Sequence, residues 1–289
     1  MEYLLIPLMC FLAVTKVSLQ SQFSKSRTFG FADNTFYNFV MFTAAAILFL
    51  PVLFLKRTSA DTYIFGIIAG ILSVGFQLSY MFAFSCGKPV LVTTVNNFSM
   101  FIPIAVSCIF LCEPFGSMKM IALFFAAVSI WIITSKNNTK ISSSATSNRW
   151  LLYTLLAFFC NGFISSNQKI YANFSTAFDA FSFVAITYVT ASCLSFAIFK
   201  LTVYNKSVVF KWDKETIVSA GTSGIFLGIF QCVSTYAASV IDGVILYTVY
   251  NCATNILFVV VRTIFFRDNL SKKQILGVIS GLCAILFMQ

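Results

Sequence analysis

Apolar runs of about 20 residues recur from one end of this 289-residue chain to the other. Because about 20 residues of α-helix cross the hydrocarbon core of a bilayer, such runs with few charges are typical of membrane-spanning helices. A transmembrane β-barrel would need segments of about ten residues that alternate apolar and polar side chains, and this sequence lacks them. The predicted fold class is therefore an all-α integral membrane protein. Its ten predicted transmembrane helices are Tyr3–Phe23, Thr35–Leu55, Tyr63–Phe84, Val90–Leu111, Gly116–Ser135, Trp150–Ala172, Phe181–Val203, Ile217–Ala238, Gly243–Phe266 and Lys273–Met288.

The strongest pattern within these runs is a duplication. The block Val90–Trp131 matches the block Ile245–Leu286 at a constant shift of 155 residues, without a gap. The third predicted helices match at a shift of 154, and the first ones match more loosely at 153. Because an internal repeat reveals the unit from which a fold is built, we predict two related five-helix units. The polar pairs that coincide between the units are Lys16 and Lys169, Gln77 and Gln231, Thr93 and Thr248, and Asn96 and Asn251.

The two predicted units are separated by a polar linker, residues 136–149, which is rich in Ser, Asn and Thr. The first unit is residues 1–135 and the second is residues 150–289. An odd number of crossings leaves the chain on the opposite side of the membrane, so the second unit enters upside down relative to the first. Inverted repeats of this kind are common in secondary transporters, whose binding sites lie near the bilayer midplane where the repeats meet.

Composition supports a membrane location and argues against nucleic-acid binding. Hydrophobic residues make up 59% of the chain and charged residues only 10%, whereas about a quarter of the residues in soluble domains are charged. The net charge of +10 is carried mostly by short connectors between the apolar runs, where it indicates membrane topology. The bias toward odd-numbered connectors places these in the cytoplasm and both termini outside. We expect a multi-pass protein of the cell membrane, of the bacterial inner-membrane kind.

The sequence lacks the residue clusters of an enzyme or a metal site. It has no His, its nine Cys show no CxxC spacing, and its Asp and Glu residues are isolated from one another. We therefore predict no catalytic residue, no metal and no cofactor. The expected partners are a small-molecule solute and the lipid bilayer, without nucleic acid. A monomer is compatible with the sequence, which leaves the oligomeric state open.

The chain resembles the ten-helix, EamA-like members of the drug/metabolite transporter (DMT) superfamily over almost its whole length. Besides the two five-helix units, the resemblance is carried by an acidic corner after the fourth and ninth predicted helices, followed by a helix with small residues four apart. The corners are Glu113-Pro114-Phe115 and Asp268-Asn269-Leu270-Ser271, and the small residues are Ala122/Ala126 and Gly277/Gly281. Asp268 stands where Glu is usual, and members of the family usually keep both termini in the cytoplasm. The resemblance implies a carrier with a central cavity lined by predicted helices 1, 3, 4, 6, 8 and 9, and no catalytic chemistry.

Polar side chains inside the apolar runs are the candidates for a binding site. Lys16 either anchors an anionic group of the solute or extends to the membrane surface. Gln77 and Gln231 either contact the solute or bond to other helices. Asn96 and Asn251 are the strongest candidates, since each has a Thr three residues earlier on the same helix face. The complete set of predicted substrate-binding residues is Lys16, Gln77, Tyr80, Thr93, Asn96, Lys169, Gln231, Tyr247, Thr248, Asn251 and Asn255.

These patterns favour a secondary transporter that moves a small polar metabolite, such as an amino acid or another zwitterion or anion, by alternating access. Because aromatic faces alone can hold quaternary ammonium groups, an organic-cation transporter of the same fold is the alternative. A membrane scaffold without transport activity is a third reading, which the matched buried polar residues disfavour.

Overall fold

The computed structural model describes residues 4–26, 30–55, 57–86, 89–113, 116–134, 144–206 and 213–266, together with 276–277, 279–280, 283 and 287. These residues form helices joined by short connections, and no strand occurs among them. The elements are α1 (Leu5–Ser26), α2 (Phe31–Leu55), α3 (Ala60–Cys86), α4 (Pro89–Asn97), the 3₁₀ helix η2 (Phe98–Met100), α5 (Phe101–Phe110), α6 (Ser117–Thr134), α7 (Ser144–Phe174), α8 (Ala180–Lys206), α9 (Lys214–Val240) and α10 (Gly243–Phe266).

The all-helical, membrane-protein class that the sequence predicts agrees with this architecture. Five helices, in α1, α2, α3, α8 and α9, are long and apolar enough to cross a membrane. Large apolar side chains also cover the outside of the described structure, as in lipid-facing surfaces. On α3, for example, Ile64, Ile67, Ile68 and Ile71 are 42–57% exposed.

The predicted helix boundaries differ most from the observed ones at the start of α7. Helix α7 begins at Ser144, six residues before the predicted start at Trp150, so the polar linker 136–149 is partly helical. The tenth predicted helix, Lys273–Met288, and the corner at Asp268 lie largely outside the described residues.

The fourth predicted helix, Val90–Leu111, is interrupted in the structure. One 3₁₀ turn, η2, separates α4 from α5. Pro103 has no N–H to donate to the carbonyl of Ser99, four residues earlier, so the regular α-helical ladder fails at this point. A stretch of 3₁₀ helix inside a longer helix often marks a hinge.

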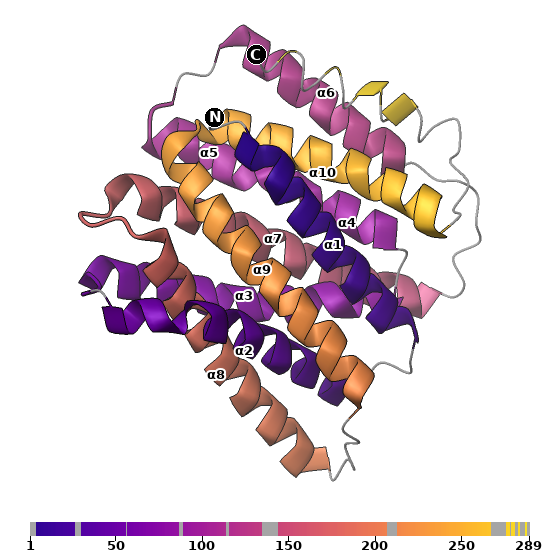
Figure 1. The fold of residues 1–289 in the computed structure, drawn as a ribbon. Helices are drawn as coiled ribbons and strands as arrows, with labels where there is room; N and C mark the ends of the chain where they lie inside the picture. Colours follow the sequence, from indigo (N-terminus) through magenta and orange to yellow (C-terminus); the bar gives the residue numbers. More distant parts are fainter. Residues whose placement is uncertain are drawn as a thin grey trace.

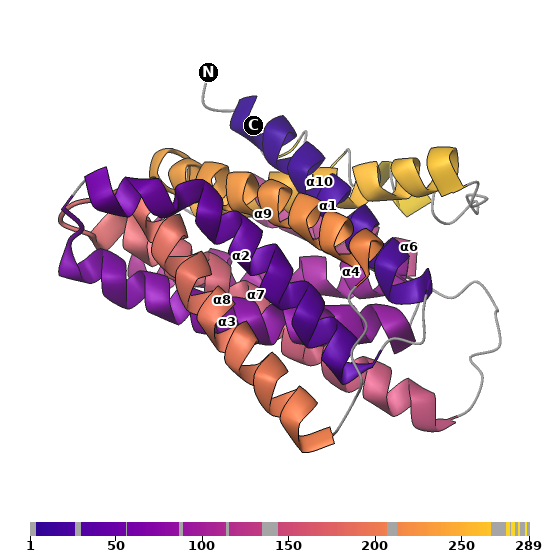
Figure 2. The ribbon, with the colours of Figure 1, turned by 60° about the horizontal axis from the view of Figure 1, so that its bottom comes forward.

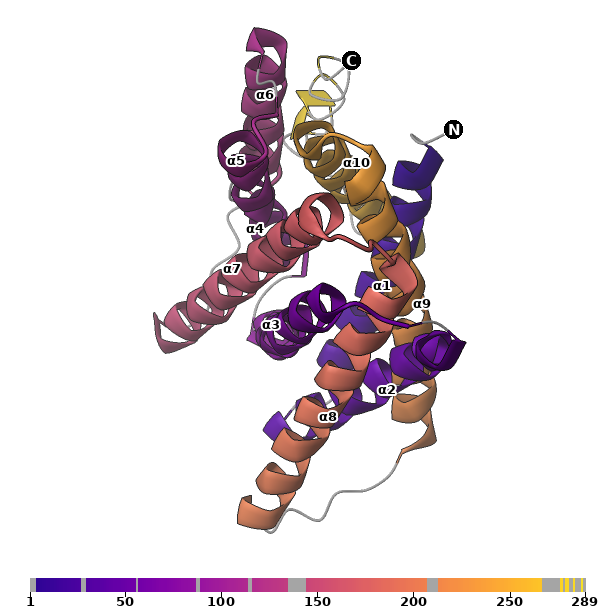
Figure 3. The same ribbon diagram turned by 90° about the vertical axis from the view of Figure 1, so that its left-hand side faces the viewer.

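The helices pack in pairs that join the two predicted units. Helix α2 contacts α8 and α9, α3 contacts α7 and α8, and α1 contacts α9 and α10. Figure 1 shows α1 and α9 side by side across the molecule, and Figure 2 shows the N-terminal end of α1 projecting from the bundle. In Figure 3, α6 lies at one edge of the bundle and α8 at the opposite edge. The segments that pack most extensively are therefore far apart in sequence.

Glycine permits two of the closest helix contacts. A Cβ atom on Gly70 of α3 would lie 2.7 Å from the carbonyl oxygen of Thr187 in α8. On α9, a Cβ atom on Gly224 would collide with the carbonyl oxygen of Met41 in α2. The two glycines coincide in the predicted repeat, and small residues let membrane helices approach this closely.

Candidate functional site

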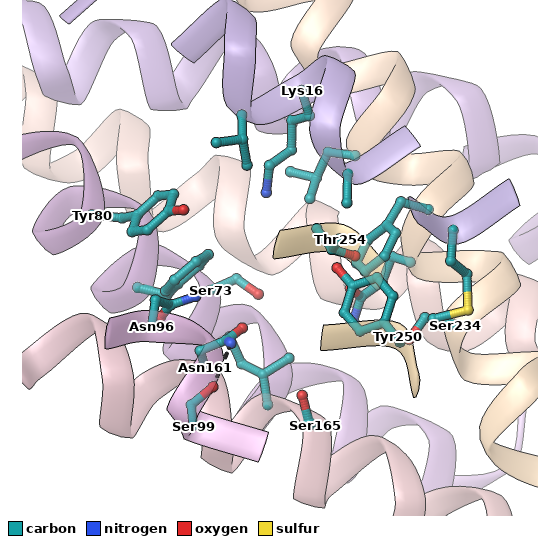
Figure 4. Close-up of a pocket in the computed structure, with 18 of the residues that line it drawn as sticks. Lys16, Ser73, Tyr80, Asn96, Ser99, Asn161, Ser165, Ser234, Tyr250 and Thr254 are labelled. Carbon is teal, nitrogen blue, oxygen red and sulfur yellow. Dashed lines mark hydrogen bonds between the residues drawn. The ribbon is translucent and has the colours of Figure 1, made fainter. Parts of the chain in front are cut away.

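A cavity of about 90 Å³ lies between helices from both predicted units (Figure 4). Since a cavity needs about 10–15 Å³ to hold one water, this space accommodates several waters or a small solute. Its polar lining residues are Lys16, Ser73, Gln77, Tyr80, Thr93, Asn96, Asn97, Ser99, Asn161, Ser165, Gln168, Tyr188, Gln231, Ser234, Tyr247, Tyr250, Asn251 and Thr254. The cavity is therefore polar, although it lies within a largely apolar bundle.

Lys16 supplies the only positive charge among the residues that line this cavity. Figure 4 shows its side chain entering from α1, with Nζ pointing into the space between Tyr80 and Asn96 on one side and Tyr250 on the other. The residue is 6% exposed, and its Nζ lies 5.7 Å from the centroid of the Phe76 ring. No hydrogen bond or ion pair to Lys16 occurs in the described part of the chain, and no Asp or Glu lines the cavity.

The amide side chains of α4 face the same space. Thr93, Asn96 and Asn97 are spaced three and four residues apart, which places them on one side of a helix. Thr93 accepts a 3.2 Å hydrogen bond from the hydroxyl of Tyr80. Among the described residues, Asn96 Oδ1 and Asn97 Nδ2 have no hydrogen-bond partner, although both residues are only 6% exposed. Unsatisfied buried amides cost about 1–3 kcal/mol each, so these two are available for a solute.

Helix α10 presents Tyr247, Tyr250, Asn251 and Thr254 to the cavity. This spacing of three, four and seven residues again defines one helix face. Asn251 donates to the carbonyl of Tyr247 in its own helix at 2.7 Å, and the Tyr247 hydroxyl donates to the carbonyl of Ser165 at 2.9 Å. The aromatic rings of α10 therefore form one wall of the cavity.

Two predicted residues of α10 do not line the cavity. Thr248 and Asn255 are buried elsewhere, at 0% and 1% exposure. The prediction aligned Thr248 with Thr93 of α4, but the observed cavity face of α10 begins one residue earlier, at Tyr247. One residue turns a side chain by about 100° around a helix, which moves Thr248 away from the cavity.

Gln77 and Gln231 both line the cavity but differ in their bonding. Gln77 Oε1 accepts a 3.0 Å hydrogen bond from Gln20 Nε2 of α1, so it joins two helices. Gln231 is 5% exposed, and its Nε2 has no partner among the described residues. Of the two alternatives left open by the sequence, interhelical bonding describes Gln77, whereas Gln231 keeps its amide free.

Lys169, which the sequence aligns with Lys16, lies outside this cavity. Its Nζ is 2.9 Å from Glu113 Oε1 and donates to the carbonyls of Ala238 at 3.1 Å and Ile241 at 2.9 Å. Glu113 Oε2 also accepts from the backbone N–H of Gly243, at the start of α10, at 2.8 Å. Lys169, a predicted solute-binding residue, thus forms a buried ion pair that joins α7 to the ends of α9 and α10.

Several cavity residues were missed by sequence reasoning. Asn161, Ser165 and Gln168 of α7 form a polar stripe at spacings of four and three residues, which helical periodicity could have identified. The Asn161 amide donates to Ser99 Oγ of η2 at 2.7 Å (Figure 4). Asn97 could also have been included, since it directly follows Asn96.

The side chains that line the cavity can bind and orient a solute. Among the described residues, those that line it include no carboxylate or imidazole for acid–base catalysis, and no group of His, Cys, Asp and Glu is suited to a metal ion. Hydrogen bonding, a single positive charge and aromatic faces are the available interactions.

The chain matches no protein-family model and no curated protein sequence. Its structure resembles solved structures, of which 28 chains match. One of these, described only as "Crystal structure of protein", aligns with a TM-score of 0.74 over 99% of this chain and 95% of its own length. The two sequences are 11% identical, so the likeness shows a shared fold and carries no information about function.

Proposed function

We propose that this protein is a secondary transporter of a small polar solute in the cell membrane, of the bacterial inner-membrane kind. In this proposal it is a ten-helix, inverted-repeat member of the DMT superfamily, related to the EamA-like proteins. The observation that carries the proposal is the buried polar cavity lined by both predicted units. Unpaired amides and an unpaired lysine in an otherwise apolar bundle are costly, which favours a binding function over mere packing.

The arrangement of helix contacts supports the inverted repeat in this proposal. In the predicted repeat, α1, α2 and α3 are related to α7, α8 and α9. The contact of α1 with α9 then has its counterpart in the contact of α7 with α3. The contact of α2 with α9 likewise has its counterpart in that of α8 with α3. An alternating-access carrier built from two such units exposes one central site to each side in turn.

The interrupted helix beside the cavity also supports transport. Ser99 and Met100 of η2 line the cavity at the point where α4 gives way to α5. Discontinuous helices are common at the binding sites of secondary transporters. An organic-cation transporter of the same fold remains the second candidate, because aromatic rings line the cavity, although the lysine disfavours a cationic solute.

Transport can be tested with purified protein in proteoliposomes, supplied with an isotope-labelled extract of soluble cell metabolites. We expect at least one solute to accumulate above the level in protein-free liposomes. Asn96→Ala and Asn251→Ala are expected to reduce that accumulation at least about fivefold, the effect of losing one hydrogen bond of about 1 kcal/mol. If no solute accumulates with the wild-type protein, the proposed function is wrong.

Asn173→Ala is a matched control for Asn251→Ala. Each of these amides donates to the carbonyl four residues earlier in its own helix, at 2.8 Å in Asn173 and 2.7 Å in Asn251. Asn173 does not line the cavity between the two units. We expect Asn173→Ala to transport as the wild type does. Equal losses in both variants would indicate a general packing effect instead of a loss of solute contact.

A further inference from the structure

We propose that the cavity is selective for small organic monoanions, and that Lys16 Nζ binds the carboxylate of the solute. This inference rests on the proposed transport function and specifies the class of solute. It is argued from the unpaired charge of Lys16, from the charge balance of the cavity and from the unpaired amide atoms in its lining.

Two buried lysines in the part of the chain that the structure describes, Lys16 and Lys169, differ in their pairing. An ammonium group has three donors. Lys169 uses all three, on one carboxylate oxygen and two backbone carbonyls, and is 3% exposed. Lys16 is almost as buried, at 6%; its Nζ lies 5.7 Å from the centroid of the Phe76 ring and makes no hydrogen bond or ion pair among the described residues. The same fold therefore satisfies one buried lysine from its own atoms and leaves the other directed into a cavity.

The net positive charge of the cavity lining favours a solute with one negative charge. Among the described residues, those that line it include one lysine and no arginine, aspartate or glutamate. A solute with one carboxylate would make the occupied cavity neutral. A zwitterion would leave one uncompensated positive charge in a poorly hydrated space, and a doubly charged phosphate ester would leave one uncompensated negative charge. An organic cation would add a second positive charge to that of Lys16. The monoanion is therefore the solute that minimises the electrostatic cost.

The unpaired amide atoms in the cavity lining indicate a second polar group on the solute. Asn96, Asn97 and Gln231 lack side-chain partners within the described structure, and each is at least nine-tenths buried. Amides both donate and accept, so they suit a hydroxyl, carbonyl or amide group. The cavity volume of about 90 Å³ limits the solute to a small molecule in this conformation. A hydroxy- or oxo-monocarboxylate offers a carboxylate to Lys16 and a second polar group to the amides.

A direct test compares carboxylates with their uncharged primary amides. Thermal unfolding of the purified wild-type protein is measured with lactate, pyruvate and benzoate, and with lactamide, pyruvamide and benzamide. Ligands that bind the folded state raise the unfolding temperature by mass action. We expect at least one carboxylate to bind about 10- to 100-fold more tightly than its amide, as a hydrogen bond to a charged group suggests. If no carboxylate protects better than its amide, the proposal is overturned.

Lys16→Met should abolish the difference between carboxylate and amide. Lys200→Met is the matched control, because it removes the same charge from an exposed position on α8 outside the cavity. We expect Lys200→Met to keep the preference for the carboxylate. If Lys16→Met also keeps it, another group binds the anion and the assignment of Lys16 is wrong. The wild-type comparison stands even if Lys16→Met does not fold.

Three further probes separate the competing solute classes. Alanine represents a zwitterion, choline an organic cation and glycerol 3-phosphate a doubly charged ester. Stronger protection by any of these than by the carboxylates would refute monoanion selectivity. If the proteoliposomes accumulate a solute that is not a monoanion, transport is supported and only this inference fails. If nothing accumulates, the transport proposal itself fails.

Discussion

The buried ion pair between Lys169 and Glu113 makes a strong prediction about stability. The side chain of Lys169 is 4% exposed and that of Glu113 is 11% exposed, with 2.9 Å between Nζ and Oε1. Lys169 also donates to two carbonyls at the C-terminal end of α9. Glu113 accepts the backbone N–H groups of Gly243 and Val244, at 2.8 and 3.4 Å, at the start of α10. Each charge thus complements a helix end of opposite polarity.

Removing the lysine should cost more than neutralising the glutamate. Lys169→Met leaves a buried carboxylate and two carbonyls without their partner, and loss of one member of a buried pair costs about 3–5 kcal/mol in the free energy of unfolding. Glu113→Gln keeps an oxygen that can accept from Gly243 and from Lys169, so we expect a loss of about 1–3 kcal/mol. In the double variant neither charge is left uncompensated. Its cost should be smaller than the sum of the two single costs by about 1–3 kcal/mol.

Thermal unfolding of the purified variants in detergent tests this order. At about 2 °C per kcal/mol, Lys169→Met should unfold roughly 6–10 °C below the wild type. The exposed Lys200→Met variant controls for the change in net charge and should unfold within about 1 °C of the wild type, since surface charges contribute little. The reasoning is refuted if Lys169→Met unfolds at the same temperature as Lys200→Met, or if the two single costs simply add.

Two further pairs of variants separate packing from binding. Gly224→Ala should lower the free energy of unfolding by about 1–3 kcal/mol because its Cβ would meet the carbonyl of Met41, whereas Gly221→Ala, with nothing within 4 Å, should raise it by about 0.5–1 kcal/mol. Chemical unfolding of both would show this difference in sign, and equal effects would contradict the packing argument. Gln77→Leu should destabilise the protein by about 1 kcal/mol through loss of its interhelical hydrogen bond, while Gln231→Leu should not lower stability, because it removes an unsatisfied amide, and should reduce solute accumulation. The opposite assignment of the two effects would refute the distinction between these glutamines.

The positions of the helices could be predicted from the sequence because hydrophobic length alone determines them. Nine predicted spans, from the first at Tyr3–Phe23 to the ninth at Gly243–Phe266, coincide with helices that the structure describes. Hydropathy does not reveal the polar start of α7 at Ser144, which continues a helix beyond its apolar part. The interruption near Pro103 was not predicted, because the position of the 3₁₀ turn depends on tertiary packing, which restores hydrogen bonds around prolines in membrane helices.

The residues that line the cavity could be predicted in part from the sequence. Where predicted and observed lining residues differ, the difference corresponds to a rotation about the helix axis. Asn96 and Asn251 line the cavity, as the polar pattern of the predicted repeat indicated. The loose shift of 153 aligned Lys16 with Lys169, whereas a shift of 152 aligns it with Gln168, which does line the cavity. A single residue corresponds to about 100° of rotation. A repeat without a strict register therefore identifies the helix that contributes to a site more reliably than the face of that helix.

The differences between matched residues suggest how a duplicated unit can serve both stability and binding. Of the lysines, Lys169 is saturated by protein atoms and Lys16 is free in the cavity. Of the glutamines, the first-unit residue Gln77 is bonded and the second-unit residue Gln231 is free. Of these two matched pairs, each predicted unit therefore contributes one side chain that bonds to the protein and one that is unpaired at the cavity. A site with the same groups on both sides would place two positive charges around one solute, at a high desolvation cost. Divergence of the copies leaves a single charge in the cavity, from Lys16 of the first unit, together with uncharged amides from both units, such as Asn96 and Gln231. A monoanion bound to Lys16 would then be held in one orientation.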